Sequence, residues 1–340
     1  MIKEFSEQYA AENKIRCHMP GHKGLDFSDS FFSGKTEHKS LNTRDITEIQ
    51  GADCLYKAKG IIFQDERRAS KLFNTADTFF SAGGCTLCIQ TLVYLMRKRE
   101  IFFYGEMHTS FFNICKILNI IPKQIENFEM ISDNSAVFLT SPDYFGRIAD
   151  IKDISEIVRK KNSFLTVDNA HGTHLAFYEK TQHPIHLGAD FTCDSGFKTL
   201  PGQTGSAYIH TVHNGFREQF KHIMSMFGSS SPNYNILESL DFCNEYIEKN
   251  IKSDLASILP LLQKLKSPHW NSETTDLFHM AIKNNIPIRN IEPEYLCEDF
   301  IILLFSPMFK DISKVEEIIK GYEPYYPKQN DNRKIFSSYV

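Results

Sequence analysis

The stretch "SFLTVDNAHG", residues 163–172, places a short apolar run directly before a cluster of polar and small residues. A second stretch of the same kind, "GADFTCDSGFK", follows at residues 188–198. Short apolar runs that end in turn-forming residues are typical of strands buried on both faces of a parallel sheet. In such sheets ligands bind outside the carboxyl ends of the strands. The two stretches therefore predict an α/β fold with a ligand site just beyond these two strands.

Strand and helix patterns alternate on both sides of these stretches. Strands that alternate with helices predict a mostly parallel sheet with helices on both faces. Polar clusters follow several of the predicted strands, so we expect one site that is assembled from several strand ends. We expect strands within residues 75–84, 100–105, 135–142, 163–172, 188–195 and 205–212, and helices within residues 85–99, 108–119 and 150–162.

The pattern also predicts three parts along the chain: an N-terminal arm (residues 1–50), a large domain that carries the predicted ligand site (51–227) and a small C-terminal α+β domain (228–340). The small domain begins with a loop of turn-forming residues, "GSSSPNYN". Its expected elements are a long helical segment at 236–266 broken at Pro260, a helix at 274–285, a strand at 299–307, and a helix at 311–322 with Asp311 as N-cap.

Composition excludes several classes of protein. The 340 residues carry a net charge of −4, which argues against a broad nucleic-acid surface. The charged N-terminus has no apolar core of a signal peptide, and no apolar run is long enough to cross a membrane. The 8 cysteines are scattered, as expected of reduced thiols. We expect a cytoplasmic protein with no nucleic-acid or membrane partner.

The sequence around Lys198, "DSGFKTL", is compatible with three roles for this lysine. It is a surface lysine, a phosphate-binding lysine of a P-loop, or a nucleophile that carries a cofactor. A P-loop requires glycine directly before the lysine, whereas Phe197 stands there. The surface reading is weakened because Lys198 follows a buried-looking strand, and burying an unpaired lysine costs free energy. A desolvated lysine amine forms a Schiff base with a carbonyl cofactor such as pyridoxal phosphate.

Such a cofactor requires specific neighbours, and the sequence offers a candidate for each. Asp168, at a strand end, can hold the proton on the pyridine nitrogen. "AGGCT", residues 82–86, can bind the phosphate at a helix N-terminus, with Ser195 adding a hydroxyl. His108 can stack on one face of the ring, and Ala170 is small enough to lie against the other. Individually, the aspartate also suits a helix cap, and His108 a core or N-cap position.

These residues lie in segments that together resemble the bacterial Orn/Lys/Arg decarboxylase group, fold-type-I enzymes that depend on pyridoxal phosphate. The segments run in the family's order over about the first 240 residues. They are "MPGHKG" (19–24), "RDITEIQGADCL" (44–55), "FFSAGGCT" (79–86), "MHTSFFN" (107–113), "TSPDYFGRIAD" (140–150), "VDNAHGTHLAF" (167–177), "GADFTCDSGFKTLPGQTGSAYIH" (188–210) and "SSSPNYNILESLD" (229–241).

The resemblance implies a role for each residue. Lys198 would carry the cofactor, Asp168 would pair with its ring nitrogen, His108 would stack on the ring, and His171 would help orient it. It further implies decarboxylation of arginine, lysine or ornithine to a polyamine or its precursor, in a homodimer or higher homo-oligomer. The residues expected at the phosphate are Gly84, Cys85, Thr86 and Ser195.

The sequence departs from the family pattern at several positions. Phe197 stands where the family has a phosphate-contacting histidine, the phosphate turn reads "AGGCT", and the C-terminal part is shorter. Two other functions therefore stay open. One is a pyridoxal phosphate enzyme of the same fold with another reaction, such as an aminotransferase or lyase. The other is a degenerate homologue with a binding or regulatory role.

Three further pairs of residues raise weaker hypotheses. Cys85 and Cys88 have the spacing of a redox pair or half a zinc site, and helix-start packing is the alternative. His18 and His22 lie on either side of Pro20-Gly21, so they do not share a helical turn. They also lack a third ligand nearby, so we expect no metal. Glu298 and Asp299 are possible partners for a cationic substrate, although solvated loop charge is the simpler reading.

Overall fold

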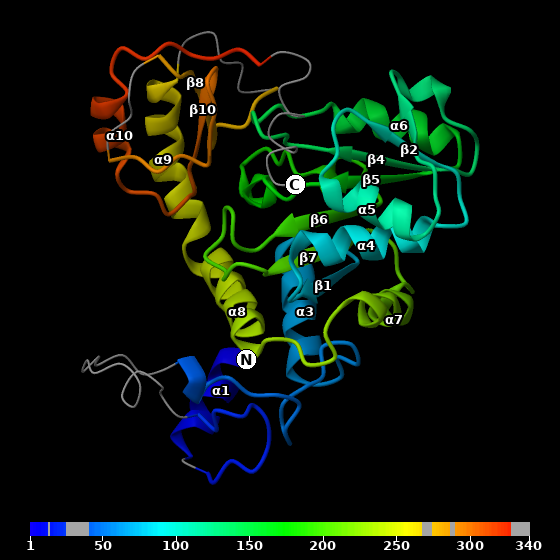
Figure 1. The fold of residues 1–340 in the computed structure, drawn as a ribbon, viewed down its shortest axis with the longest axis vertical. Helices are drawn as coiled ribbons and strands as arrows, with labels where there is room; N and C mark the ends of the chain where they lie inside the picture. The colour runs from blue at the N-terminus through cyan, green and yellow to red at the C-terminus, as the bar shows by residue number, and fades with distance from the viewer. Residues whose placement is uncertain (13, 25–40, 267–273, 286–289, 328–340) are drawn as a thin grey trace.

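The computed structural model describes residues 1–12, 14–24, 41–266, 274–285 and 290–327. It contains a seven-stranded sheet and a separate three-stranded sheet, with helices α8 and α9 running from one toward the other (Figure 1). This architecture confirms the predicted α/β fold class. The domain boundaries that the sequence suggests stay a prediction. In the described ranges, no helix is both long enough and apolar enough to span a membrane.

The large sheet has the strand order β1-β7-β6-β5-β4-β2-β3. Strands β6, β5, β4, β2 and β3 pair in parallel, whereas β7 is antiparallel to both of its neighbours. The carboxyl ends of the parallel strands therefore meet at one edge. The bounds are β1 Asp77–Ser81, β2 Ile101–Tyr104, β3 Lys123–Ile125, β4 Ala136–Thr140, β5 Phe164–Asp168, β6 Phe191–Ser195 and β7 Ala207–Thr211.

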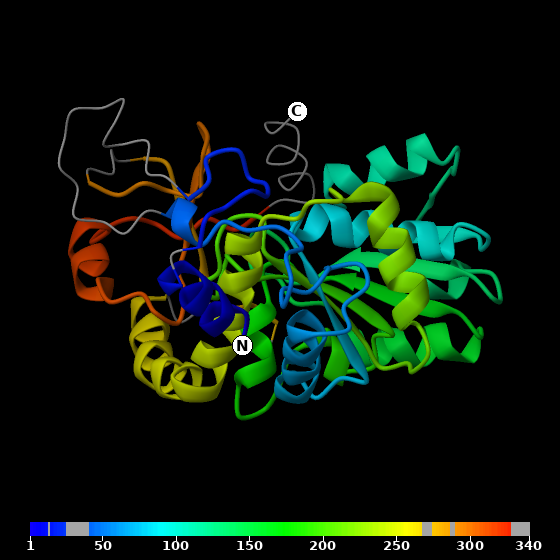
Figure 2. The same cartoon turned by 90° about the horizontal axis from the view of Figure 1, so that it is seen from below.

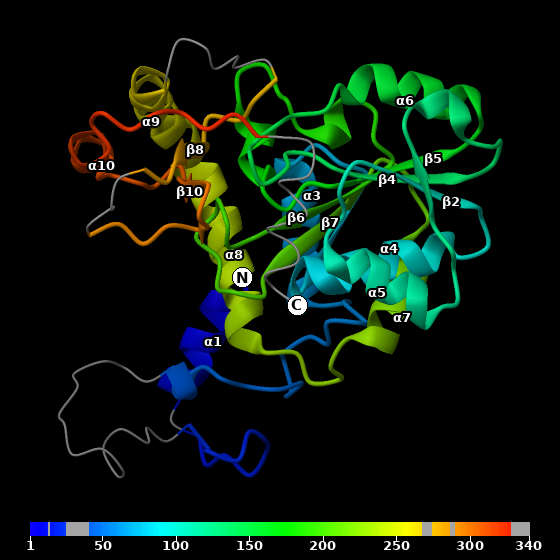
Figure 3. The ribbon, with the colours of Figure 1, turned by 45° about the horizontal axis from the view of Figure 1, so that its top comes forward.

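Helices cover both faces of this sheet. Figure 3 shows α4, α5 and α7 on one side and α6 on the other. Neighbouring strand residues point to opposite faces: Phe138 packs in the core under α4, α5 and α7, and Val137 packs under α6. This is why the strands read as continuous apolar runs. The helices are α3 Ile61–Leu72, α4 Gly84–Met96, α5 Thr109–Ile117, α6 Ile151–Lys160, α7 Arg217–Phe227 and α8 Tyr234–Lys249.

The small sheet has the order β8-β10-β9 and is antiparallel. It is formed by β8 (His279–Lys283), β9 (Tyr295–Leu296) and β10 (Phe300–Leu304), and is accompanied by α9 (Ile251–Leu265) and α10 (Ile312–Ile318). Strand β10 lies in the middle, and four of its five residues are buried. The antiparallel pairing gives β10 partners on both sides, as a buried apolar strand requires.

Two predictions for this region are wrong. The segment at 274–285 was expected to be helical, but it contains strand β8, because pairing with β10 outweighs its local helical preference. The long helical segment is not broken at Pro260, which lies inside α9; the break is at Asn250, between α8 and α9. Pro260 is exposed on the helix surface. Asp311 does precede α10, but its side chain makes no capping hydrogen bond.

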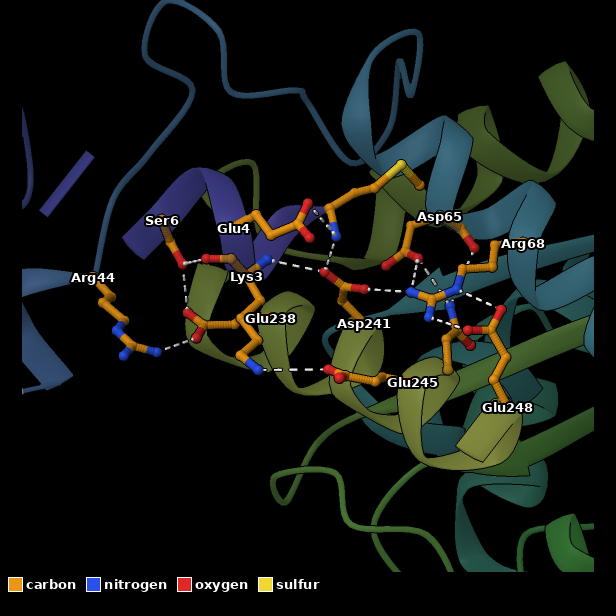
Figure 4. A network of polar contacts seen from close by, with 12 residues as sticks. Lys3, Glu4, Ser6, Arg44, Asp65, Arg68, Glu238, Asp241, Glu245 and Glu248 are labelled. Carbon is orange, nitrogen blue, oxygen red and sulfur yellow. Dashed lines mark hydrogen bonds and ion pairs between the residues drawn. The ribbon is translucent and has the colours of Figure 1, made fainter. Parts of the chain in front are cut away.

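The N-terminal arm docks on α8 and α3 through charged contacts. Helix α1 (Ile2–Ala11) lies beside α8 and α3 (Figure 2). The carboxylate of Asp241 accepts hydrogen bonds from the Lys3 amide at 3.0 Å and from Arg68 at 2.9 Å (Figure 4). Arg44 pairs with Glu238 at 2.6 Å. These contacts tie α1 and the segment after it to one face of α8.

Candidate active site

A cavity of about 300 Å³ opens at the carboxyl edge of the large sheet. Its walls come from the ends of β4, β5 and β6, from the start of α4, and from the turns around residues 144, 170, 197 and 204. The structure brings all of the predicted site residues to this one cavity. It is lined by Gly83, Gly84, Cys85, Thr86, Ile89, His108, Thr140, Tyr144, Asp168, Ala170, His171, Ser195, Phe197, Lys198, Thr204 and Gly205.

Lys198 lies in the turn after β6, where its side chain reaches into the cavity. Its Nζ is 2.7 Å from Nε2 of His171 and 5.6 Å from the centroid of the Tyr144 ring. Aromatic faces attract cations at such distances. Lys198 is therefore not an ordinary surface lysine: its amine is held between an imidazole and an aromatic ring.

Asp168 is the last residue of β5 and is 6% exposed. Its Oδ1 accepts hydrogen bonds from the amide of Ala170 at 3.2 Å and from the thiol of Cys193 at 3.4 Å. Because these neighbours hold the carboxylate through one oxygen, the other can serve a partner in the cavity. A carboxylate in this position suits a protonated ring nitrogen.

The first turn of α4 forms the wall opposite. The helix begins at Gly84, with Gly83 as N-cap and no side-chain cap. Helix N-termini present unpaired amides and a partial positive charge, which favours a bound anion. Gly84 has φ +64°, a conformation that favours glycine, and its amide donates to Gly205 at 2.7 Å. Cys85, Thr86 and Ser195 lie beside it in the cavity wall.

His108 combines two of the expected roles. Its side chain caps α5 by accepting a hydrogen bond from the amide of Ser110 at 3.2 Å, as the N-cap alternative proposed. Its ring also lines the cavity. Burial lowers the pKa of His108, and although Asp168 opposes this, Lys198 reinforces it. A neutral ring that the cap holds in place is suited to stacking on a planar ligand.

His171 belongs to a polar network that sequence reasoning missed. Its Nδ1 lies 3.1 Å from Nε2 of His279, whose Nδ1 lies 2.7 Å from Oδ2 of Asp276. The Tyr144 ring lies 4.6 Å from the His171 ring, centroid to centroid. Tyr144 lies within the "TSPDYFGRIAD" stretch, which could have signalled it. His279 and Asp276 lie more than 100 residues from His171, and no local pattern marks them.

The cavity suits pyridoxal phosphate in the chemistry of its side chains. It offers an amine on Lys198, a carboxylate on Asp168 and an uncapped helix start for the phosphate. Phe197 lines the cavity where a further phosphate ligand was expected. Thr204, which the sequence did not single out, adds a hydroxyl beside Gly205. The roles of the individual residues stay predictions.

The remaining acidic candidates lie elsewhere. Glu298 and Asp299 are exposed in the turn between β9 and β10 and do not line the cavity. Glu294 is closer in electrostatic terms: desolvation raises its pKa, whereas Lys198 and His279 lower it. Glu294 is nevertheless exposed and does not line the cavity, so its link to Lys198 is electrostatic only.

The two other weak hypotheses concern a histidine pair that could bind a metal and a cysteine pair with redox spacing. The ring of His18 lies 2.6 Å from the hydroxyl of Tyr9, and that of His22 lies 3.1 Å from Asp45, so the two histidines have separate partners. Cys85 and Cys88 are free thiols on the first turn of α4. Burial raises the pKa of Cys88 well above its usual value, which disfavours the reactive thiolate.

Several known proteins are similar to this chain in sequence or in fold. The chain is 28% identical over 288 residues to the uncharacterized protein YaaO of Bacillus subtilis, covering 76% of this chain and 59% of that one. It is 27% identical over 260 residues to an arginine decarboxylase of the same organism, covering 69% of this chain and 53% of the relative. The chain thus spans little more than half the length of these relatives.

The fold matches that of a solved structure, lysine decarboxylase A from Pseudomonas aeruginosa, with a TM-score of 0.76 at 16% identity. The match covers 94% of this chain and 59% of that one. A family model described as "Orn/Lys/Arg decarboxylase, major domain" matches residues 93–293, more than half of the chain. This segment includes His108, Asp168, His171 and Lys198. The chain therefore belongs to the Orn/Lys/Arg decarboxylase family, through its major domain.

Proposed function

We propose that this protein binds pyridoxal phosphate on Lys198 and decarboxylates a basic amino acid: arginine, lysine or ornithine. The observation that carries the proposal is the position of Lys198, with Nζ 2.7 Å from His171 in a cavity that Asp168 and His108 also line. Family membership and the resemblance to an arginine decarboxylase support the choice of reaction.

Each side chain has a task in this proposal. When bound, pyridoxal phosphate supplies a sink for the electrons released as a bond to the substrate α-carbon breaks. Asp168 would hold the proton on the ring nitrogen, and His108 would restrict the ring to one plane. The start of α4 and Ser195 would bind the phosphate. Lys198 would return a proton to the α-carbon.

Glu294 supports a cationic substrate. Its carboxylate, directly before β9, interacts favourably with Lys198 without lining the cavity, so we propose that it attracts such a substrate through its charge. We further propose that the protein works in the cytoplasm as a homodimer or higher homo-oligomer, as the family resemblance implies. Both properties rest on the resemblance alone.

The test begins with the visible spectrum of the purified protein after addition of pyridoxal phosphate. We expect an absorption band that free cofactor lacks and that Lys198→Ala does not form. Lys180→Ala is a suitable control, because Lys180 is an exposed lysine outside the cavity wall. A wild-type protein without the band would refute the proposal.

Substrate is then assigned by adding arginine, lysine and ornithine separately and measuring CO₂. Release from one of them supports decarboxylation. A band without CO₂ release, but with turnover of another amino acid, would instead identify an aminotransferase or lyase. A band with no turnover of any amino acid would favour the non-catalytic alternative, to which Phe197 and the altered phosphate turn point.

A further inference from the structure

A line of buried side chains connects the small sheet to Lys198. The His171 ring lies between the amine of Lys198, at 2.7 Å, and the ring of His279, at 3.1 Å. His279 in turn lies 2.7 Å from Asp276, directly before β8. His171 is 4% exposed, and His279 and Asp276 are each 1% exposed. The line therefore runs through the protein interior.

The direction of the first hydrogen bond, between His279 and Asp276, follows from the charge of Asp276. Burial alone would raise the pKa of Asp276, but His174 and His279 outweigh it and lower that pKa well below its usual value. An ionised carboxylate only accepts hydrogen bonds, so Nδ1 of His279 carries a proton. When this is the only ring proton of His279, its Nε2 accepts from Nδ1 of His171. This leaves Nε2 of His171 to accept from the amine of Lys198.

His171 is suited to pass a proton on. Burial first, and then the unfavourable interactions with charged Lys198 and with a protonated His279, lower the pKa of His171 well below its usual value. The ring is therefore neutral, with one nitrogen that donates and one that accepts. A neutral imidazole can gain a proton at one nitrogen while it loses the other, so its net charge does not change.

We propose that His171, His279 and Asp276 form a proton wire that converts the ammonium of Lys198 into the amine that attacks a carbonyl group. The N–H bond of Lys198 breaks as an N–H bond forms at Nε2 of His171. The Nδ1–H bond of His171 breaks as one forms at Nε2 of His279. One proton thus moves from Lys198 to His279, where the new imidazolium lies against the ionised Asp276.

The loop that follows β4 holds this wire in place. Tyr144 packs on the His171 ring, and the Asp276 amide donates to the carbonyl oxygen of Gly146 at 2.7 Å. A Cβ on Gly146, which has φ +79°, would lie 2.7 Å from Cβ of His279. The loop after β4 therefore fixes the position of His279 in β8 and of Asp276 before it.

Other titratable groups face the same line. His174 and Tyr178 share Oδ1 of Asp276, at 3.0 Å and 3.4 Å. Nζ of Lys266 donates to the backbone oxygen of Asp276 at 2.9 Å, and burial lowers the pKa of Lys266 to about 7. His108 adds a further unfavourable interaction with a charged His171, whereas Glu294 interacts favourably with Lys198 and His279. Asp276 and Glu294 thus both favour a positive charge on His279 at the far end of the wire.

The inference rests on the proposed function, and two variants of His279 separate proton transfer from positioning. His279→Gln can donate to Asp276 and accept from His171, so it preserves the orientation of His171 but cannot pass a proton. His279→Ala removes both properties. Tyr178→Phe is the matched control, because it removes a hydrogen bond to the other oxygen of Asp276 and leaves the wire intact.

The first measurement is the rate at which the apo protein develops the visible band with pyridoxal phosphate, from pH 6 to 9. We expect both His279 variants to be slower at pH 7 by about 10-fold or more, within the range for positioned proton transfer. The deficit should shrink as the pH rises, because hydroxide then takes the proton directly. Tyr178→Phe should match wild type throughout.

The second measurement is ¹⁵N NMR of the histidine rings in the apo protein, which reports the tautomer without cofactor. We expect the Nδ1–H tautomer for His171 in wild type and in His279→Gln, and a mixture in His279→Ala. A wild-type capture rate for His279→Gln at every pH, or the opposite tautomer in wild type, refutes the wire. A wild type that forms no band refutes the proposed function instead.

Discussion

Asp65, on α3, is a buried carboxylate whose charge is poorly compensated. It is 0% exposed, and its Oδ2 has no hydrogen-bond partner among the described residues. Oδ1 accepts from Asn244 at 3.1 Å. Burial and the nearby charge of Asp241 raise the pKa of Asp65 to about 7. We predict that Asp65→Asn stabilises the protein at pH 8.

The magnitude follows from the two pKa values. The shift from 3.8 to about 7 is about 3 units, and at ~1.4 kcal/mol per unit it corresponds to an upper limit of ~4 kcal/mol. The folded pKa is the higher one, so the folded state binds more protons between these values. The stability contribution of Asp65 is therefore fully present below about pH 4 and is lost as the pH rises through about 7.

The substitution also removes one attraction and adds one hydrogen bond. The 3.6 Å contact between Asp65 and Arg68 is lost, which reduces the gain at pH 8 to between about 2 and 4 kcal/mol. The new amide can donate to Oδ1 of Asn244, which is itself buried without a partner in the described part of the chain.

Urea unfolding followed by circular dichroism at pH 5, 6, 7 and 8 measures this difference. The free energy of unfolding of Asp65→Asn relative to wild type should grow by up to ~1.4 kcal/mol per pH unit and level off above pH 7. Glu248→Gln is the control, because its hydrogen bond with Arg68 lowers the pKa of Glu248 and keeps it ionised throughout. A difference for Asp65→Asn that is the same at pH 5 and pH 8 would refute the reasoning.

Three further predictions concern the candidate site. Gly146→Ala should lower the free energy of unfolding by more than the ~1–2 kcal/mol that a positive φ costs, because its Cβ meets His279. Gly215→Ala, at φ +87° with open space around it, should show the strain alone in the same urea titration. Phe197→His should tighten pyridoxal phosphate binding by about 10-fold through a charge-assisted hydrogen bond, measured by titration of the visible band, and an unchanged affinity would place the phosphate elsewhere. Asp168→Asn should keep the band but lower kcat by about 10² or more, whereas wild-type turnover would exclude the role proposed for Asp168.

Much of the large sheet was predictable from local sequence. Its strands are short apolar runs because both faces are buried, and β4, β5 and β6 end in polar residues at the edge where the ligand site lies. Asp168 and Lys198 are recognisable for the same reason, since each closes or follows such a run. The strand β3, Lys123–Ile125, was missed because only one of its three residues is buried.

The small sheet was less predictable. The segment that contains β8 has a helical pattern, and it is a strand because β10 pairs along its whole length. The partner strand, β10, lies some 20 residues further along the chain, and local propensity carries no information about this pairing. The break at Asn250 likewise depends on tertiary packing, which sets where α8 ends and α9 begins.

The sequence by itself therefore determined the fold class, the family and the residues at the strand ends. These are properties of local pattern and of motif order. Only the tertiary structure decided which groups surround Lys198. His279 and Asp276 reach His171 because the small sheet docks beside the loop that carries Gly146. A hydrogen bond between residues that are 108 positions apart produces no periodic pattern in the sequence.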